Sequence, residues 1–146
     1  MPLTPPPRDS NGEVVAHDHP GILADDGIIR RVPELWVVHE HTGRRRISSM
    51  AFRPSSGIHG GMSVDLQKQI EDAGLDARDY VTNPHWIGSI RLFAHEFRSA
   101  GCQVGYHPIN SNPYHGEVWG SFSRAQQRQL QTAATWFVAI PGVDVI

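Results

Sequence analysis

Strand-forming residues fill two neighbouring stretches of the chain on either side of a short polar segment. Residues 34–40 (ELWVVHE) are rich in strand formers, residues 41–44 (HTGR) can turn the chain, and residues 45–52 (RRISSMAF) continue the pattern. Two such runs around a turn predict a β-hairpin. Because side chains alternate between the two faces of a strand, serine and arginine would fall on both faces of the second run. This composition is unusual for a purely structural strand.

The next pattern indicates a short helix after the Gly-rich loop at 53–62. Ser63 or Asp65 can cap a helix that runs to about Ala73, and Gly74 is a suitable residue to end it. A further helical turn is expected over residues 76–80.

Two longer helices are predicted in the second half of the chain. Residues 86–100 carry apolar side chains at helical spacing before Gly101, although a strand over 87–93 is the alternative there. Ser123 caps the clearest helix, residues 124–139. The side chains that would form its buried face are Leu130, Ala133, Ala134 and Phe137.

Short strands are expected at 102–106 and 117–119, separated by a loop at 107–116. The order of these elements lacks regular alternation of strand and helix. We therefore predict an α+β fold with a small antiparallel or mixed sheet, about three helices and many loops. The first residues, 1–12, are polar and proline-rich, so we expect a disordered tail ahead of a single globular domain at 13–146.

Composition narrows the functional classes. The chain has 146 residues, of which 39% are apolar and 19% charged, with 14 Gly, 11 Pro and 9 His. One Cys excludes a disulfide scaffold and a Cys-built zinc site. A net charge of −2 argues against overall electrostatic attraction to nucleic acid. The chain shows no apolar run of membrane-spanning length and no signal-peptide pattern, so we expect a cytoplasmic protein without a membrane partner.

Three polar motifs carry a resemblance. The segments RISSMAF (46–52), GMSV (61–64) and NPYHGEV (112–118) resemble a group of small, uncharacterised bacterial proteins with R-x-S-S-x-A-F, G-x-S-V and N-P-x-H-x-x-V motifs. The resemblance covers most of the chain from about Gly27 onward. It implies that these polar positions matter, and it implies no activity.

Candidate site residues lie in or beside these motifs. We expect the catalytic groups to be His115, Glu117, Ser48 and Ser49, with substrate held by Arg45, Ser63 and Asn112. Arginine holds phosphate in a fork geometry, and histidine can serve as acid or base near neutral pH. These residue types predict a nucleotide- or phosphate-group-binding protein that is a transferase or hydrolase. Neither a GxxxxGK[ST] loop nor a GxSxG elbow is present, so classical ATP, GTP and elbow-type hydrolase sites are disfavoured.

A weak second likeness concerns ADP-ribosyltransferase-type sites, in which an Arg or His, a Ser and a Glu come from three strands. The corresponding positions here would be His39 or Arg45, then Ser48, Ser49 or Ser63, then Glu117. No stretch of the chain matches a full signature of that class, so the likeness rests on residue types alone.

Each of these residues also has a structural interpretation. Ser48 and Ser49 could occupy an exposed strand face, and Ser63 could simply cap a helix. His115 could hydrogen-bond a neighbouring loop carbonyl, and Asn112 could form an ordinary turn with the proline that follows it. These interpretations stay open at this point.

Two other functions are alternatives. The chain could be a non-catalytic protein–protein interaction module of an accessory or immunity type, with Trp36, Trp86, Trp119 and Trp136 as core or interface anchors. It could also bind a metal through two His-x-His pairs, in which His39 and His41 would join His17 and His19. The cofactor is otherwise unknown. Cys102 is expected to be a small buried apolar residue, and a nucleophilic pair with His107 has no supporting motif.

Overall fold

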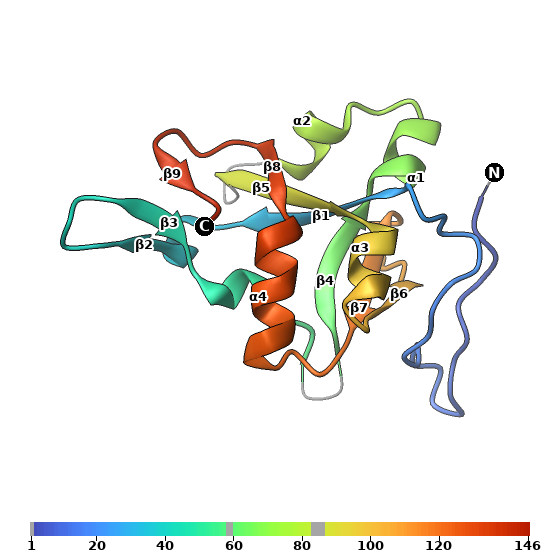
Figure 1. Cartoon of the computed structure of the whole chain (residues 1–146). Helices are drawn as coiled ribbons and strands as arrows, with labels where there is room; N and C mark the ends of the chain where they lie inside the picture. Colours follow the sequence, from blue (N-terminus) through green and yellow to red (C-terminus); the bar gives the residue numbers. More distant parts are fainter. Residues whose placement is uncertain (1, 58–59, 83–86) are drawn as a thin grey trace.

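The computed structural model describes residues 2–57, 60–82 and 87–146, and Figure 1 shows its arrangement. His59, His85 and Trp86 lie outside the described residues. A six-stranded sheet, antiparallel at every pairing, forms the centre of the domain. Its strands in spatial order are β6 (Gln103–Tyr106), β7 (His115–Trp119), β4 (Met62–Leu66), β1 (Gly27–Val32), β5 (Gly88–Phe93) and β8 (Thr135–Val138). The described residues also form four α-helices, and together with the sheet they confirm the predicted α+β class.

The hairpin is confirmed in a shorter form. β2 (Val37–His39) and β3 (Arg45–Ile47) pair antiparallel, and β9 (Val143–Asp144) pairs parallel to β3, which makes a small three-stranded sheet. The predicted strand at 45–52 stops early because Ser48 accepts a hydrogen bond from the Met50 N–H on its own Oγ. This local bond starts a 3₁₀ helix, η2 (Ser49–Phe52), in place of further strand. A second 3₁₀ helix, η1 (Glu34–Trp36), replaces the start of the predicted first strand.

The helix expected from Ser63 or Asp65 onward is wrong in its first residues. Residues 62–66 form β4, whose Met62, Val64 and Leu66 side chains are buried in the core, while Ser63 and Asp65 face the other side. This is strand alternation, and neither polar residue caps a helix. Helix α1 (Gln67–Asp72) follows, and Gly74 ends the turn at φ +79°, as predicted.

A further helical turn, α2 (Ala77–Val81), forms where it was expected. Its N-cap is Asp76, whose Oδ1 accepts a hydrogen bond from the Asp79 N–H at 3.0 Å.

The alternative interpretation of residues 86–100 is confirmed. Gly88–Phe93 is strand β5, and only Ala94–Ser99 is helical (α3), ending before Gly101 at φ +91°. β5 lies between β1 and β8, so its consecutive residues are buried on both faces. In the sequence, a strand that is buried on both faces is a run of apolar residues. Such a run also contains apolar residues at helical spacing, so the pattern alone does not distinguish strand from helix.

The C-terminal helix is also shorter than predicted. Ser123 caps α4 (Arg124–Ala133) through its Oγ, which accepts the Gln126 N–H at 3.2 Å. Residues 135–138 leave the helix and pair with β5 as edge strand β8. Thr, Trp, Phe and Val have strong strand propensity, and burial of Phe137 against Ile29 favours this pairing over a longer helix.

Helices cover both faces of the large sheet. The main core joins α3, α4, η2 and the small sheet to one face, and its largest fully buried side chains include Phe52 and Phe97. A second apolar cluster joins α1 and α2 to the other face through Ile29, Ile70 and Val81. Figure 1 shows α3 and α4 in front of the sheet, with α1 and α2 at its upper edge. In the described parts of the chain, no helix has the length and apolar character that crossing a membrane requires.

The segment expected to be a disordered tail, residues 1–12, lies against the domain from residue 2 onward. Leu3 packs on the core, Pro6 is buried, and Arg8 forms an isolated bridge with Val14. His19 anchors the segment, because its Nε2 donates to the Thr4 carbonyl at 2.8 Å. The structure therefore gives this segment specific contacts that its polar, proline-rich composition did not predict.

Candidate functional site

Four polar side chains gather where β4 and β7 pair. Ser63 lies opposite Glu117, and Asp65 lies opposite His115. Because strand side chains alternate, these four residues share one face of the sheet, and their apolar neighbours enter the core on the other face. Ser63 and His115 are diagonal neighbours across the pair, a separation that a long side chain can span.

A short hydrogen bond joins the two residues. His115 Nε2 lies 2.6 Å from Ser63 Oγ, and His115 Nδ1 lies 2.7 Å from the carbonyl oxygen of His107. A carbonyl oxygen can only accept a hydrogen bond, so Nδ1 must carry a proton. In neutral His115 the Nε2 atom is then an acceptor, and the Ser63 hydroxyl donates to it. The arrangement orients an imidazole as a base toward a serine hydroxyl.

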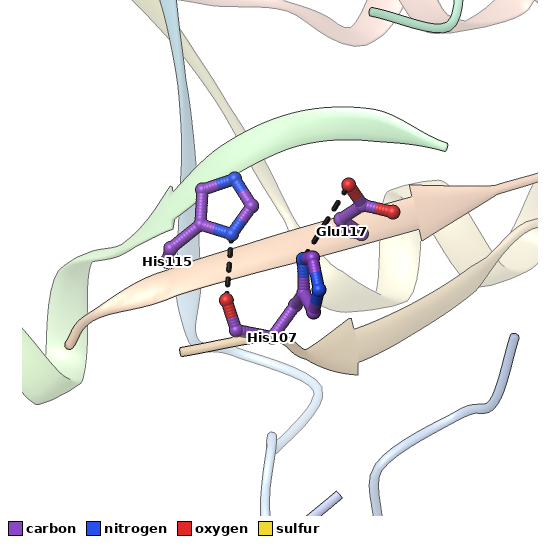
Figure 2. Close-up of side chains that lie close together, drawn as sticks. All are labelled: His107, His115 and Glu117. Carbon is purple, nitrogen blue, oxygen red and sulfur yellow. Dashed lines mark hydrogen bonds and ion pairs between the residues drawn. The ribbon is translucent and has the colours of Figure 1, made fainter. Parts of the chain in front are cut away.

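Glu117 and His107 lie beside His115. Figure 2 shows His115 and Glu117 on the same strand with His107 opposite them. Glu117 Oε2 accepts the Gly61 N–H at 3.0 Å, while its Oε1 faces His107 Nδ1 at 3.5 Å. Glu117 Oε1 and His107 Nδ1 are both buried, and neither atom has a hydrogen-bond partner among the described residues. Burial lowers the pKa of His107, and the nearby Glu117 carboxylate partly opposes that shift.

Ser63 and His115 open onto a cleft of about 590 Å³. Its lining residues are Arg30, Arg31, Trp36, Ser55, Ser63, Asp65, Tyr80, Ile109, Ser111, Asn112 and His115. With His115 neutral, two arginines and one aspartate give this lining a net charge of +1. Two aromatic rings and several hydroxyls complete the walls. The volume falls in the range of small-molecule sites, about 300–1,000 Å³.

One wall of the cleft is a hydrogen-bonded network around Asp65. Arg31 donates to both carboxylate oxygens of Asp65, at 2.8 and 3.0 Å. Asn112 Nδ2 donates to Asp65 Oδ1 at 2.7 Å, and the Tyr80 hydroxyl donates to Asn112 Oδ1 at 2.6 Å. These bonds hold three elements in fixed positions around the cleft: strand β1, helix α2 and the loop that precedes β7.

Arg30 supports a second wall of the cleft. Its guanidinium donates to the carbonyl oxygens of Ala51, Arg53 and Ser63 and to Ser55 Oγ, at 2.8–3.2 Å. The side chain also lies over the Trp36 ring, 4.8 Å from its centroid. Burial lowers the pKa of Arg30 to about 10, which still leaves the group charged at neutral pH. Arg30 therefore clamps η2 and the following loop to β4.

The structure brings together part of the predicted site. Ser63, Asn112 and His115 line the cleft, and Glu117 lies behind it, buried, outside the lining. Three further predicted site residues lie away from the cleft. Arg45 belongs to the small sheet, Ser48 caps η2, and Ser49 lines a separate hollow of about 360 Å³.

Sequence reasoning missed Arg31, Asp65, Ser55 and Tyr80 as site residues. The alternation of MSVDL at 62–66 was the available signal for Asp65, because its polar residues fall on one face if the segment is a strand. Nothing local in the sequence marks Arg31 or Tyr80, since their importance depends on partners far along the chain.

The predicted metal ligands are not gathered. His39 and His41 are exposed, and no cluster of three metal-ligating side chains within the described ranges includes either of them or His17 and His19. Both ring nitrogens of His17 and of His19 face hydrogen-bond partners instead. The one cluster found in those ranges is His107, His115 and Glu117, whose ligand atoms lie within 4.8 Å of one another. A metal ion there would have to displace one of the two hydrogen bonds of His115.

Cys102 is buried, and burial raises the pKa of its thiol to about 11, which suits a packed apolar residue. The three described tryptophans are partly buried. Trp36 and Trp136 pack against the core, and Trp119 packs against the His17 ring.

Comparison with known proteins adds no relative: no protein-family model, no curated protein and no solved structure matches the chain.

Proposed function

We propose that this protein binds a nucleotide or another phosphate-bearing ligand in the cleft and acts on it as a hydrolase or transferase, in the cytoplasm as expected from its sequence. The single observation that carries the proposal is the hydrogen bond from Ser63 to His115 at the wall of a cleft with net positive lining. His115 is the acid or base, because its Nε2 atom faces a hydroxyl that lines the cleft.

Charge supports an anionic ligand. Arg31 uses Nε and Nη2 for Asp65, which leaves Nη1 for an oxygen of the ligand. A guanidinium held rigidly by a carboxylate is a suitable phosphate partner, since less side-chain entropy is lost on binding. Arg31 thus takes the anchoring role that the sequence suggested for Arg45.

Aromatic side chains support a nucleotide in particular. Trp36 and Tyr80 both line the cleft. A base can stack on either ring, and such stacking contributes about 1–3 kcal/mol per base. Glu117 acts from behind the cleft by holding the Gly61 N–H, and it does not touch the ligand.

A thermal-unfolding screen tests the proposal. Nucleoside mono-, di- and triphosphates, dinucleotides and inorganic phosphates are each added to the full chain, and the melting temperature is recorded. A ligand that binds the native state at 100 times its Kd adds about 2.7 kcal/mol to the free energy of unfolding, so at least one compound should raise the melting temperature by several degrees.

The paired variant Arg31→Gln/Asp65→Asn removes the anchoring guanidinium together with its buried partner. We expect it to fold and to lose the ligand-induced shift, whereas Arg128→Gln, at an arginine outside the cleft, keeps it. If no nucleotide or phosphate changes the melting temperature, the proposal is wrong, and the interaction-module alternative becomes the leading one.

A further inference from the structure

We propose that Ser63 is a nucleophile that carries a covalent intermediate. This inference rests on the proposed function and deepens it, because the sequence suggested Ser63 only as a ligand-binding group. The alternative for a hydrolase with this cleft is direct attack by water, with Ser63 as a spectator. The hydrogen bonds of Ser63 and His115 favour attack by Ser63.

Ser63 meets the geometric requirement for an activated nucleophile. Its hydroxyl lies 2.6 Å from His115 Nε2, and the His107 carbonyl fixes the opposite ring nitrogen as a donor. Nucleophile, base and orienting group in this order are the recurring parts of covalent serine catalysis. The His107 carbonyl takes the place that a carboxylate holds in the best-known triads.

The other hydroxyls of the cleft lack such a base. Ser55 Oγ accepts hydrogen bonds from Arg30 Nη1 at 3.0 Å and from the Ser63 N–H at 3.1 Å. The Tyr80 hydroxyl donates to an amide oxygen of Asn112. Within the described chain, Ser63 is thus the one hydroxyl of the cleft lining with a hydrogen bond to an imidazole.

The first step forms a bond between Ser63 Oγ and the phosphorus of a phosphate ester or anhydride. The hydroxyl proton passes to His115 Nε2, and the bond from phosphorus to the leaving oxygen breaks. That oxygen then takes the proton from His115, which returns to its neutral form. The His107 carbonyl accepts from Nδ1–H throughout, so the imidazolium that forms in between keeps its orientation.

The second step releases the phosphoryl group. Water, or an acceptor alcohol in a transferase, gives its proton to His115 Nε2 and attacks phosphorus, and the P–Oγ bond breaks. Ser63 Oγ recovers a proton from His115. The two bonds that Ser55 Oγ accepts leave its own hydroxyl proton to donate to a phosphoryl oxygen.

Diisopropyl fluorophosphate tests the inference, because it transfers a phosphoryl group to activated serines with loss of fluoride. The full chain is treated at neutral pH, the intact mass is measured, and the modified peptide is sequenced by mass spectrometry. We expect one adduct per chain, on Ser63. Ser63→Ala should abolish the adduct, and the control Ser49→Ala, at a serine outside the cleft lining, should keep it.

Two further measurements separate activation from mere accessibility. His115→Gln should slow labelling by about 100-fold or more, the usual contribution of a general base. The wild-type protein should also be labelled much faster in its native state than in urea, because only the folded chain places His115 Nε2 against Ser63 Oγ. Wild-type peptide mapping needs no variant to fold, so a failure of His115→Gln to fold leaves the test intact.

An adduct on another residue, no adduct, or equal labelling of native and urea-denatured protein would overturn the inference. Nucleotide-induced thermal shifts do not depend on labelling. If those shifts occur without an adduct on Ser63, the proposed function stands with water as the direct nucleophile.

Discussion

Asn112 and Asp65 share a hydrogen bond of 2.7 Å that fastens the loop before β7 to the end of β4. The same amide accepts hydrogen bonds on its oxygen from the Tyr80 hydroxyl and the Tyr114 N–H. Asn112 therefore uses its donor and its acceptor on opposite sides at once. The cleft keeps its shape through this residue, because it joins a strand, a loop and α2.

Asn112→Asp should destabilise the protein more than Asn112→Ala. The aspartate places a second carboxylate against Asp65, whereas alanine only removes hydrogen bonds. We expect a loss of about 1–3 kcal/mol in the free energy of unfolding for alanine and a larger loss for aspartate. Urea unfolding followed by circular dichroism measures both. Ser111→Ala, at the exposed neighbour, is the control, and equal losses in all three variants would contradict the proposed network.

Arg30→Lys should destabilise the protein although the charge is kept. Arg30 is 4% exposed and makes its four bonds through a planar fork that an ammonium group cannot reproduce. Buried carbonyls would lose their donors, so we expect a loss of about 2–4 kcal/mol in urea unfolding. Arg124→Lys, on the exposed face of α4, should change stability by less than about 0.5 kcal/mol. Unchanged stability of Arg30→Lys would show that the clamp is dispensable.

Acidification should destabilise the protein in part through His107. Burial holds its pKa in the folded state below the ordinary value of 6.5, despite the Glu117 carboxylate facing it, so the unfolded chain binds the proton more readily. The contribution is fully present above pH 6.5 and is lost as the pH falls through the folded-state pKa.

His107→Gln tests this linkage, because glutamine does not titrate. Its free energy of unfolding should vary less with pH between neutrality and mild acid than that of the wild type. His41→Gln, at an exposed turn, should leave the wild-type slope unchanged. A wild-type slope in His107→Gln would mean that other groups dominate the acid response.

Cys102 should react slowly with thiol reagents in the native protein. Burial raises the pKa of its thiol to about 11 and leaves 5% of the residue exposed, so little thiolate forms and access is poor. Ellman's reagent at mildly alkaline pH should release its chromophore slowly until urea is added, then rapidly to one equivalent per chain. Fast stoichiometric reaction without urea would contradict this burial.

Local signals in the sequence predicted one helix start and two helix ends correctly. Ser123, Gly74 and Gly101 act as expected, because capping and left-handed backbone depend on a few adjacent residues. The predicted type of element is wrong at 62–66 and 135–138, where helix was expected and pairing with distant strands produces a strand. Strand β5 shows the same limit, since burial on both faces removes the alternation that identifies a strand.

The site was predictable only in part for the same reason. The sequence marks Ser63 and His115 because each lies close to glycine or proline in a polar motif, and the strand register brings the two residues together. Asp65 and Arg31 gain their role from each other, and a pair that is 34 residues apart leaves no local pattern. Ser48 accepts a hydrogen bond from its local backbone, which ends the predicted strand early, and neither Ser48 nor Ser49 is in the cleft lining.

The group that orients His115 is a main-chain oxygen, so its chemistry does not depend on which side chain the gene encodes at position 107. A triad loses its orienting carboxylate through one codon change, whereas an amide carbonyl persists through every substitution that keeps the local fold. Mutational drift at this position should therefore alter the acid response of the protein and spare the alignment of its base. The vulnerable element is instead the path of the backbone after β6, where an insertion or deletion of one residue would move that oxygen away from the ring.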